Sequence, residues 1–148
     1  MLSVFSYQNY MRLALQEARK AYQLGEVPVG AVVVSEQQVI AKAHNQTEML
    51  KDVTAHAEIL ALTAATQVLG NKYLKNCTLY VTLEPCIMCA GALAWSQLGE
   101  LVIGAEDSKK GFSCFSPSAL HPRTRLIKGI LQADCQNLLR DFFKRVRE

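Results

Sequence analysis

TAHAEILAL, residues 54–62, and LYVTLEPCIMCAG, residues 79–91, are the two stretches that decide the fold of this chain. The first places apolar residues at helical spacing behind Thr54, a residue type that caps helices, and Gly70 then ends the run. The second begins with apolar and β-branched residues and changes at Pro85 into a run of small residues. The centre of the chain is therefore predicted to be a helix, a strand, and a second helix over residues 86–97.

The same periodicities continue on both sides of this centre. Apolar positions from Met11 to Tyr22 predict a first helix, with Ser6 as its cap and Gly25 at its end. A terminal amphipathic helix is expected over residues 133–147, after a loop over residues 109–122. Strands are expected at residues 29–34, 39–43, 78–83, 101–105 and 124–130, the first two forming a hairpin. Strands that alternate with helices predict an α/β layered fold.

The overall composition indicates one compact domain spanning residues 1–148, half of it hydrophobic. No stretch approaches the roughly 20 apolar residues of a membrane helix, and the N-terminus has no signal-peptide pattern. We therefore expect a soluble, cytoplasmic protein. Its five cysteines, an odd number without a signal peptide, argue against a disulfide framework. Cys77, Cys114 and Cys135 are interpreted as unreactive thiols.

Charge is spread unevenly along the chain. Residues 1–108 carry 7 Lys/Arg and 10 Asp/Glu, whereas residues 109–148 carry 9 and 3, a balance of +6. A basic C-terminal third is typical of a protein that binds a polyanion such as nucleic acid, although solubility alone also explains it. The candidate phosphate-contacting residues are Lys109, Lys110, Arg123, Arg125, Lys128, Lys144, Arg145 and Arg147.

Three residues of the central stretches form a candidate metal site. A catalytic zinc takes three protein ligands and keeps its fourth position for water, and His56, Cys86 and Cys89 supply that number and type. Cys86 and Cys89 are three apart at a helix start, so both sulfurs face the same side. The positive end of that helix favours the thiolate forms that bind metal.

Glu58 follows two residues after His56 and is the candidate proton carrier. A carboxylate beside an activated water can take its proton and pass protons to a substrate and its leaving group. Each of these features has an ordinary explanation when taken alone: a redox pair or half of a structural zinc site, a structural histidine, or a glutamate at a helix start. Together they match the His-x-Glu and Pro-Cys-x-x-Cys pattern of zinc nucleobase deaminases.

At these residues the sequence resembles the cytidine and nucleobase deaminase superfamily, and more narrowly the bacterial tRNA adenosine deaminases. The resemblance also covers residues 26–32, 43–45, 104–107 and 138–143, so it extends over most of the chain. It implies a three-layer fold with a central mixed sheet of about five strands flanked by helices. It also implies one zinc per chain, conversion of the wobble adenosine of a tRNA anticodon to inosine, and a homodimer with RNA lying across both subunits.

The resemblance also implies roles for individual residues. His56, Cys86 and Cys89 would be the zinc ligands, and Glu58 the catalytic proton shuttle. Substrate contacts would come from Asn45 on the nucleotide, the backbone at Ala57 on the base edge, Val29 and Leu83 around the base, and Asp107 and Lys109 near the flanking phosphates.

Two departures from the family pattern affect the expected substrate. Val53 replaces a usual proline, which changes little. The loop after Gly111 is shortened, and residues 120–125 (LHPRTR) replace an Asn-His-Arg segment in a region that helps to hold RNA in the family. A deaminase of a free nucleobase or nucleoside (guanine, cytosine or adenine) therefore stays open, as does a non-catalytic zinc RNA-binding module.

Four large side chains on the predicted helices are expected to pack or to shape the substrate site. Of Phe142 and Phe143, we expect one to dock the terminal helix and the other to shape the substrate site. Met88 and Trp95 are expected to pack, within the chain or at a dimer interface.

Overall fold

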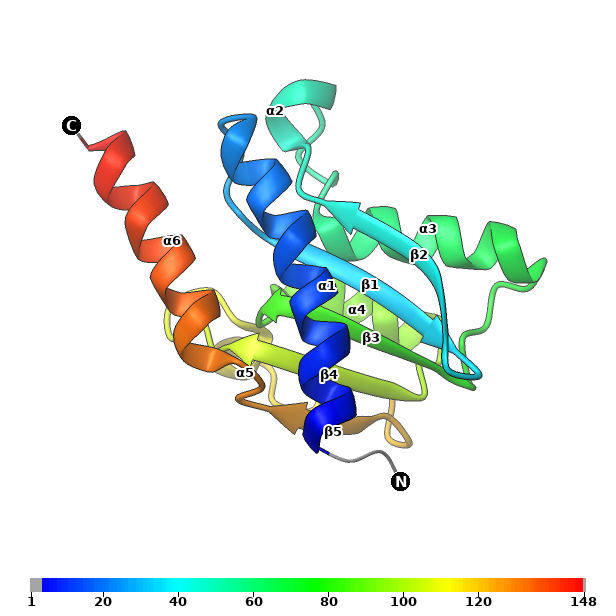
Figure 1. Cartoon of the computed structure of the whole chain (residues 1–148). Coiled ribbons are helices and arrows are strands. Elements are labelled where there is room, and N and C mark those ends of the chain that lie inside the picture. Colours follow the sequence, from blue (N-terminus) through cyan, green and yellow to red (C-terminus); the bar gives the residue numbers. More distant parts are fainter. Residues whose placement is uncertain (1–3, 148) are drawn as a thin grey trace.

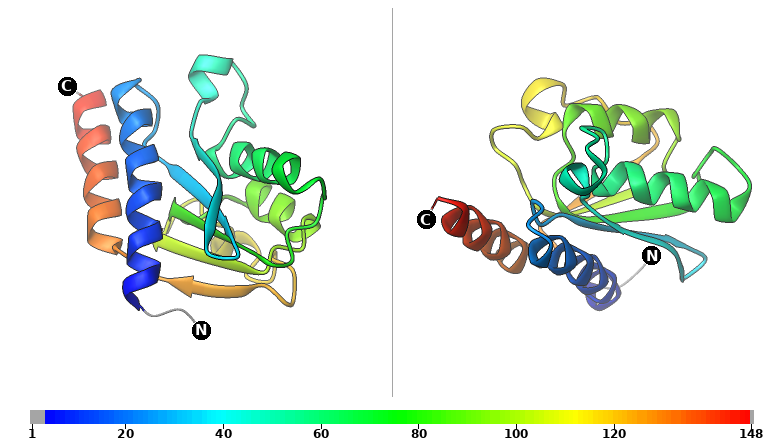
Figure 2. Two further views of the ribbon diagram at one scale, coloured as in Figure 1. Left: turned by 45° about the vertical axis from the view of Figure 1, so that its right-hand side comes forward. Right: turned by 90° about the horizontal axis from the view of Figure 1, so that it is seen from above.

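The computed structural model describes residues 4–147 as a mixed five-stranded sheet between two layers of helices (Figures 1 and 2). Residues 1–3 and 148, the ends of the single domain expected from the sequence, lie outside this description. The elements are α1 (Val4–Gln23), β1 (Gly30–Ser35), β2 (Gln38–His44), α2 (Thr47–Leu50), α3 (Ala57–Leu69), β3 (Cys77–Leu83), α4 (Ile87–Trp95), β4 (Glu100–Ala105), α5 (Phe112–Phe115), β5 (Arg125–Lys128) and α6 (Gln132–Val146).

The sheet has the order β2-β1-β3-β4-β5. β1 pairs antiparallel with both β2 and β3, while β3, β4 and β5 run parallel. α1 and α6 cover one face, and α3 and α4 cover the other (Figure 2). The expected three-layer fold is therefore confirmed. β3 and β4 end at the same edge of the sheet, beside the starts of α3 and α4.

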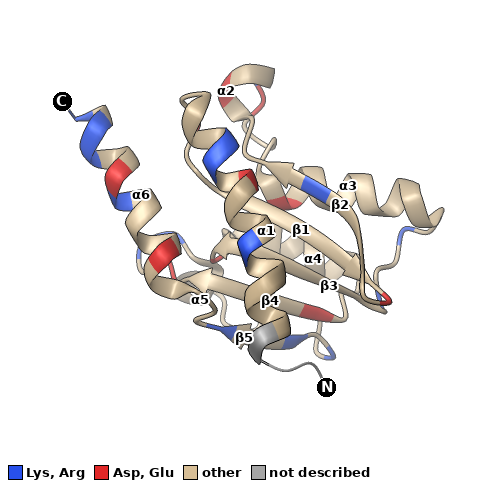
Figure 3. Cartoon of the chain, viewed as in Figure 1, with Lys and Arg blue, Asp and Glu red and all other residues tan. Residues whose placement is uncertain are grey.

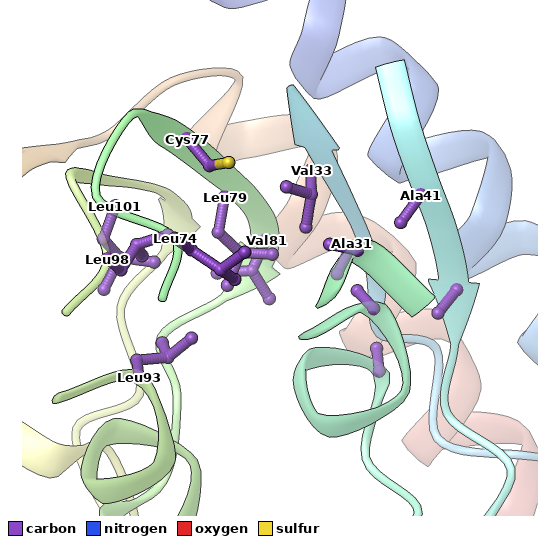
Figure 4. Packing of buried hydrophobic residues seen from close by; sticks show 14 of the residues in the cluster. Ala31, Val33, Ala41, Leu74, Cys77, Leu79, Val81, Leu93, Leu98 and Leu101 are labelled. Carbon is purple, nitrogen blue, oxygen red and sulfur yellow. The ribbon is translucent and has the colours of Figure 1, made fainter. Parts of the chain in front are cut away.

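The core consists of two apolar layers, one on each face of the sheet. Successive residues of β1 alternate between them: Ala31 and Val33 pack under α3 and α4, and Val32 and Val34 pack under α1. Figure 4 shows part of the first layer, including Leu79 and Val81 from β3 and Leu93 from α4. Because helices cover both faces, the inner strands have almost continuous apolar sequences.

Close approach of α1 to the sheet depends on Gly30. A Cβ atom at this position would lie 2.0 Å from the carbonyl oxygen of Ala14 and 2.4 Å from the backbone nitrogen of Ala18. Helix α1 therefore rests directly on the backbone of β1. Within residues 4–147, none of the helices combines the length and apolar character required to cross a bilayer.

The helix starts differ from the expectation in two places. α1 already includes Val4, so Ser6 lies inside the helix rather than at its cap. Thr54 does not cap α3 either, because its hydroxyl donates to Asp52 Oδ1 at 2.7 Å in a turn that precedes the helix. The cap position falls to His56, which places its ring at the mouth of α3.

Two short helices lie where loops were expected. The carboxylate of buried Glu26 accepts hydrogen bonds from the backbone N–H groups of Glu48 and Met49, at 3.0 and 2.8 Å, and so holds the start of α2. α5 lies inside the predicted 109–122 loop. Both helices border the edge of the sheet at which α3 and α4 begin.

Candidate active site

The starts of α3 and α4 bring three metal-binding side chains together. His56 caps α3 and Cys86 caps α4, with Cys89 one turn further on. His56 Nδ1 lies 3.7 Å from Cys86 Sγ and 3.4 Å from Cys89 Sγ. One ligand atom from each residue falls within 4.8 Å of the others. The arrangement can hold one metal ion, as the spacing in the sequence predicted.

The two thiols and the imidazole of this trio shift one another's pKa values. A hydrogen bond from Cys89, assisted by His56, lowers the pKa of Cys86 to about 4. The same contact with Cys86, together with burial, raises the pKa of Cys89 far above its usual range. The neighbouring Cys86 also raises the pKa of His56. A cation bound here would displace these protons, because thiolate and neutral imidazole are the metal-binding forms.

Glu58 lies on the first turn of α3 beside the trio. It is buried, with 4% of its surface exposed. Burial raises the pKa of Glu58 to about 7, since it disfavours the carboxylate, although His56 opposes the shift. A carboxyl group with a pKa in this range can both accept and release a proton near neutral pH.

A cavity of about 390 Å³ opens over His56, Cys86 and Glu58. Among the predicted substrate contacts, Val29, Asn45, Ala57, Leu83 and Asp107 line it. Val27, Thr47, Glu84, Lys110 and Phe143 complete its wall. Cys89 lies buried beneath it. The floor of the cavity is therefore polar, and its wall combines apolar side chains such as Val29 and Leu83 with a few polar groups, a lining common in small-molecule sites.

Asn45 is held in place by the backbone around it. Its side-chain nitrogen donates to the carbonyl oxygen of Val27 at 3.2 Å, and its Oδ1 accepts from the N–H of Thr47 at 3.3 Å. An amide nitrogen has two N–H groups, so the second stays available to a molecule in the cavity.

Lys109 is the one predicted contact that does not line the cavity. Oδ1 of Asp107 accepts hydrogen bonds from the backbone N–H groups of both Lys109 and Lys110, at 3.1 and 3.0 Å. In the turn that results, Lys110 reaches the cavity wall. The sequence identified the basic pair, but the turn decides which of the two lines the cavity.

Glu84 is a structural anchor that the sequence analysis missed. It is buried, and its Oε1 accepts from the N–H of Asp107 at 3.1 Å. Its Oε2 accepts from the N–H and the hydroxyl of Ser113, at 3.0 and 2.6 Å. A Cβ atom on Gly111 would lie 2.3 Å from the Glu84 carboxyl carbon. Residues 107–113 are therefore fixed to the segment that carries Cys86.

α6 contributes to the cavity from the other layer. Phe143 lines the cavity, whereas Phe142 packs edge-on against Tyr22 of α1 with ring centroids 5.7 Å apart. Tyr22 also donates a hydrogen bond to Asp141 and accepts one from Arg145. Phe142 therefore docks the helix, as expected for one of the pair, and a role of Phe143 in shaping the substrate site stays a prediction.

The basic residues of the C-terminal third do not form one surface. Figure 3 shows the basic end of α6 far from the basic residues of β5 and the loop before it. Lys110 lines the cavity over His56, but Arg123 and Arg125 line a second cavity at the opposite ends of the strands. The candidate phosphate-contacting residues are therefore divided between the two ends of the sheet, and their contact with RNA stays a prediction.

Comparison with known proteins gives the chain its family. The MafB19-like deaminase family model matches residues 5–147. The chain is 45% identical over 145 residues to the tRNA-specific adenosine deaminase of Aquifex aeolicus (strain VF5), covering 95% of each protein. A solved structure from work on A-to-I editing by tRNA:A34 deaminases superposes with a TM-score of 0.82 at 40% identity, over 88% of this chain and 99% of that one.

A further solved structure shows how widely the fold is shared. The guanine deaminase of Nitrosomonas europaea matches with a TM-score of 0.80 at 26% identity, over 91% of this chain and 83% of that one. The extent and identity of the match to the Aquifex protein are decisive, and the chain belongs to the family of tRNA-specific adenosine deaminases.

Proposed function

We propose that this protein converts the wobble adenosine of a tRNA anticodon to inosine by hydrolytic deamination. The observation that carries the proposal is the convergence of His56, Cys86 and Cys89 beside buried Glu58 at the floor of one cavity. The names of the relatives, tRNA-specific adenosine deaminase, supply the substrate.

Zinc is the metal that fits this donor set. Two thiolates and one imidazole suit zinc better than calcium or magnesium, and three protein ligands leave one coordination position for water. We therefore propose one zinc per chain, held by His56, Cys86 and Cys89. When bound, zinc supplies the acidity that makes water a nucleophile near neutral pH.

Glu58 is proposed to move the protons of the reaction. It takes one proton from the attacking water and delivers it to the ring nitrogen next to the amine-bearing carbon of adenine. It then takes the second proton of that water and passes it to the departing amine, which leaves as ammonia. The balance is adenosine plus water to inosine plus ammonia. A pKa of about 7 for Glu58 suits both directions of transfer.

The cavity wall is proposed to hold the flipped nucleotide. Val29 and Leu83 lie on its apolar sides and would flank the base, while the backbone at Ala57 would read the base edge. The free N–H of Asn45 would bind the nucleotide. Asp107 and the lysine pair Lys109–Lys110 would lie near the flanking phosphates, with Lys110 the closer of the two.

The proposal includes a homodimer. Trp95 has 85% of its surface exposed at the end of α4, and Ile87 and Met88 are exposed at the start of the same helix. Large apolar side chains gathered along one helix are costly in water and typical of an interface. A second copy of this chain is the proposed partner. Because tRNA is a cytoplasmic molecule, the proposal also places the enzyme in the cytoplasm.

The experiment incubates zinc-loaded protein with total tRNA and, separately, with free adenine, guanine, cytosine and their nucleosides. Inosine in tRNA without turnover of a free base supports the proposal. Turnover of a free base with tRNA left unmodified would contradict tRNA as the substrate but still support zinc-dependent deamination. Glu58→Gln should lower kcat by roughly 10²- to 10⁴-fold and retain zinc. Full tRNA binding with no turnover in the wild type would instead point to a zinc-stabilised RNA-binding module.

A further inference from the structure

A second cavity of about 490 Å³ lies at the far end of the sheet from the candidate active site. It is lined at the starts of β3, β4 and β5, whereas the first cavity lies where β3 and β4 end. A strand advances about 3.3 Å per residue, so the length of β3 separates the two cavities by roughly 20 Å. The far cavity is therefore no extension of the active site.

The lining of the far cavity carries excess positive charge. Lys75, Arg123 and Arg125 contribute cations, and Glu100 is the single acidic residue. Glu100 is already engaged: its Oε2 lies 3.3 Å from Arg125 Nη2 and accepts from the hydroxyl of Tyr7 at 3.1 Å. Arg125 is thus anchored at one edge, and its other N–H groups stay available. The cavity favours an anion.

Backbone contacts fix the walls of this cavity. The N–H of Gly99 donates to the carbonyl of Leu74 at 3.1 Å, and the N–H of Arg125 donates to the carbonyl of Gly99 at 3.0 Å. The hydroxyl of Thr124 donates to the carbonyl of Leu98 at 2.6 Å. The segment with Lys75 and the segment with Arg123 and Arg125 are thus both joined to residues 97–100 before any ligand arrives, which lowers the cost of binding.

One side chain adds direction to the charge. His121 Nδ1 accepts from the N–H of Arg123 at 3.1 Å, which leaves Nε2 to carry a proton and donate it to an anion in the cavity.

We propose that this cavity, named here the distal cavity, binds the sugar–phosphate backbone of the tRNA substrate away from the edited base. A phosphate would lie among Lys75, Arg123 and Arg125, with His121 Nε2 as a further donor. The inference rests on tRNA being the substrate. It also gives a role to residues 120–125, the segment in which this chain departs from the family pattern.

The test uses the Lys75→Ala/Arg123→Ala double variant of the zinc-loaded protein. Both residues are exposed and distant from the cavity over His56. Affinity for tRNA is measured between 50 and 200 mM salt. The variant gives up the one phosphate contact proposed here, which lowers the slope of log K against log salt by about 0.7–0.9, so over this fourfold range it should lose roughly threefold less affinity than the wild type.

The control is Arg19→Ala/Lys42→Ala, which removes the same charge from exposed residues that line neither cavity. It should keep the wild-type slope, and all three proteins should keep the same kcat at saturating tRNA. Equal slopes in the two double variants, or no tRNA binding by the wild type, would overturn the inference. Wild-type binding without editing would contradict the proposed function while the slopes still report on the distal cavity.

A second measurement separates RNA from free phosphate. Inorganic phosphate is titrated while the imidazole resonances of His121 are followed by NMR. A shift that Lys75→Ala/Arg123→Ala abolishes, together with a reduced salt slope for tRNA, supports the inference. The same shift with an unchanged tRNA slope overturns the RNA assignment and identifies a site for free phosphate.

Discussion

Replacing the buried carboxylate of Glu84 by an amide tests whether this residue anchors the wall of the active site. The carboxylate accepts three hydrogen bonds, from the N–H of Asp107 and from the N–H and hydroxyl of Ser113. Glu84→Gln leaves one acceptor oxygen and turns an N–H₂ group toward a donor. Hydrogen bonds to a charged group contribute about 1.5–3 kcal/mol each, so losing one and opposing another donor should cost about 2–4 kcal/mol.

The loss is measured by urea and thermal unfolding of the zinc-loaded protein. For a chain of this length about 3 °C of Tm corresponds to 1 kcal/mol, so Tm should fall by roughly 6–12 °C. Asp107 and Lys110 would lose their fixed positions, and kcat/KM for tRNA should fall roughly 10- to 100-fold. Zinc content should stay at one per chain, because the ligands are untouched.

Glu106→Gln is the matched control. Glu106 is a neighbouring carboxylate with more than half of its side chain exposed, and it pairs with Lys128 at 3.4 Å. Exposed pairs contribute about 0–1 kcal/mol, so this variant should unfold almost like the wild type. If Glu84→Gln cost no more than Glu106→Gln and left kcat/KM unchanged, the anchoring role derived from the hydrogen bonds would be refuted.

Three further perturbations address the fold, the metal and the assembly. Gly30→Ala forces a Cβ atom onto the backbone of α1 and should lower the free energy of unfolding in urea by about 3 kcal/mol or more. In the control, Gly91→Ala, nothing lies within 4 Å of the added Cβ atom, so stability should stay unchanged or rise by up to ~1 kcal/mol. Equal losses in the two variants would contradict the close packing of α1 on β1. Cys86→Ala leaves two ligands, so zinc measured by atomic emission should fall well below one per chain while the circular dichroism persists, and full retention would exclude Cys86 as a ligand. Trp95→Glu should shift the sedimentation coefficient from dimer to monomer at micromolar concentration, and an unchanged value would place the interface elsewhere.

The metal trio was predictable from the sequence because its geometry is local to two helix starts. His56 opens α3, Cys86 opens α4, and Cys89 follows one turn later on the same side. The apolar strand β3, which lies between α3 and α4 in the sequence, indicated that both helices pack against one sheet. Right-handed crossovers place such helices on one face of the sheet, but their neighbouring starts depend on the strand order β2-β1-β3-β4, which the spacing of the residues does not give.

The surroundings of the trio were less predictable because they depend on contacts distant in sequence. α2 is four residues long and is held by Glu26, more than 20 residues earlier, so no local propensity indicates it. Glu84 anchors Ser113 across 29 residues, and nothing in its own stretch distinguishes it from a polar strand end. The basic residues of the C-terminal third are divided between two places because the chain between β4 and β5 runs from one end of the sheet to the other, and composition alone does not indicate that division.

The residues that line the cavity over His56 come from two different parts of the fold. His56, Glu58 and Cys86 belong to helices packed on β3 at the centre of the sheet, whereas Phe143 and Lys110 come from α6 and the loop after β4 at its periphery. Mutations at the periphery can therefore alter which molecule enters without disturbing the reaction at the centre. The fold shared with a guanine deaminase at 26% identity fits that freedom. For enzyme engineering, this division identifies Lys110 and Phe143 as positions to randomise, and His56, Glu58 and Cys86 as positions to keep.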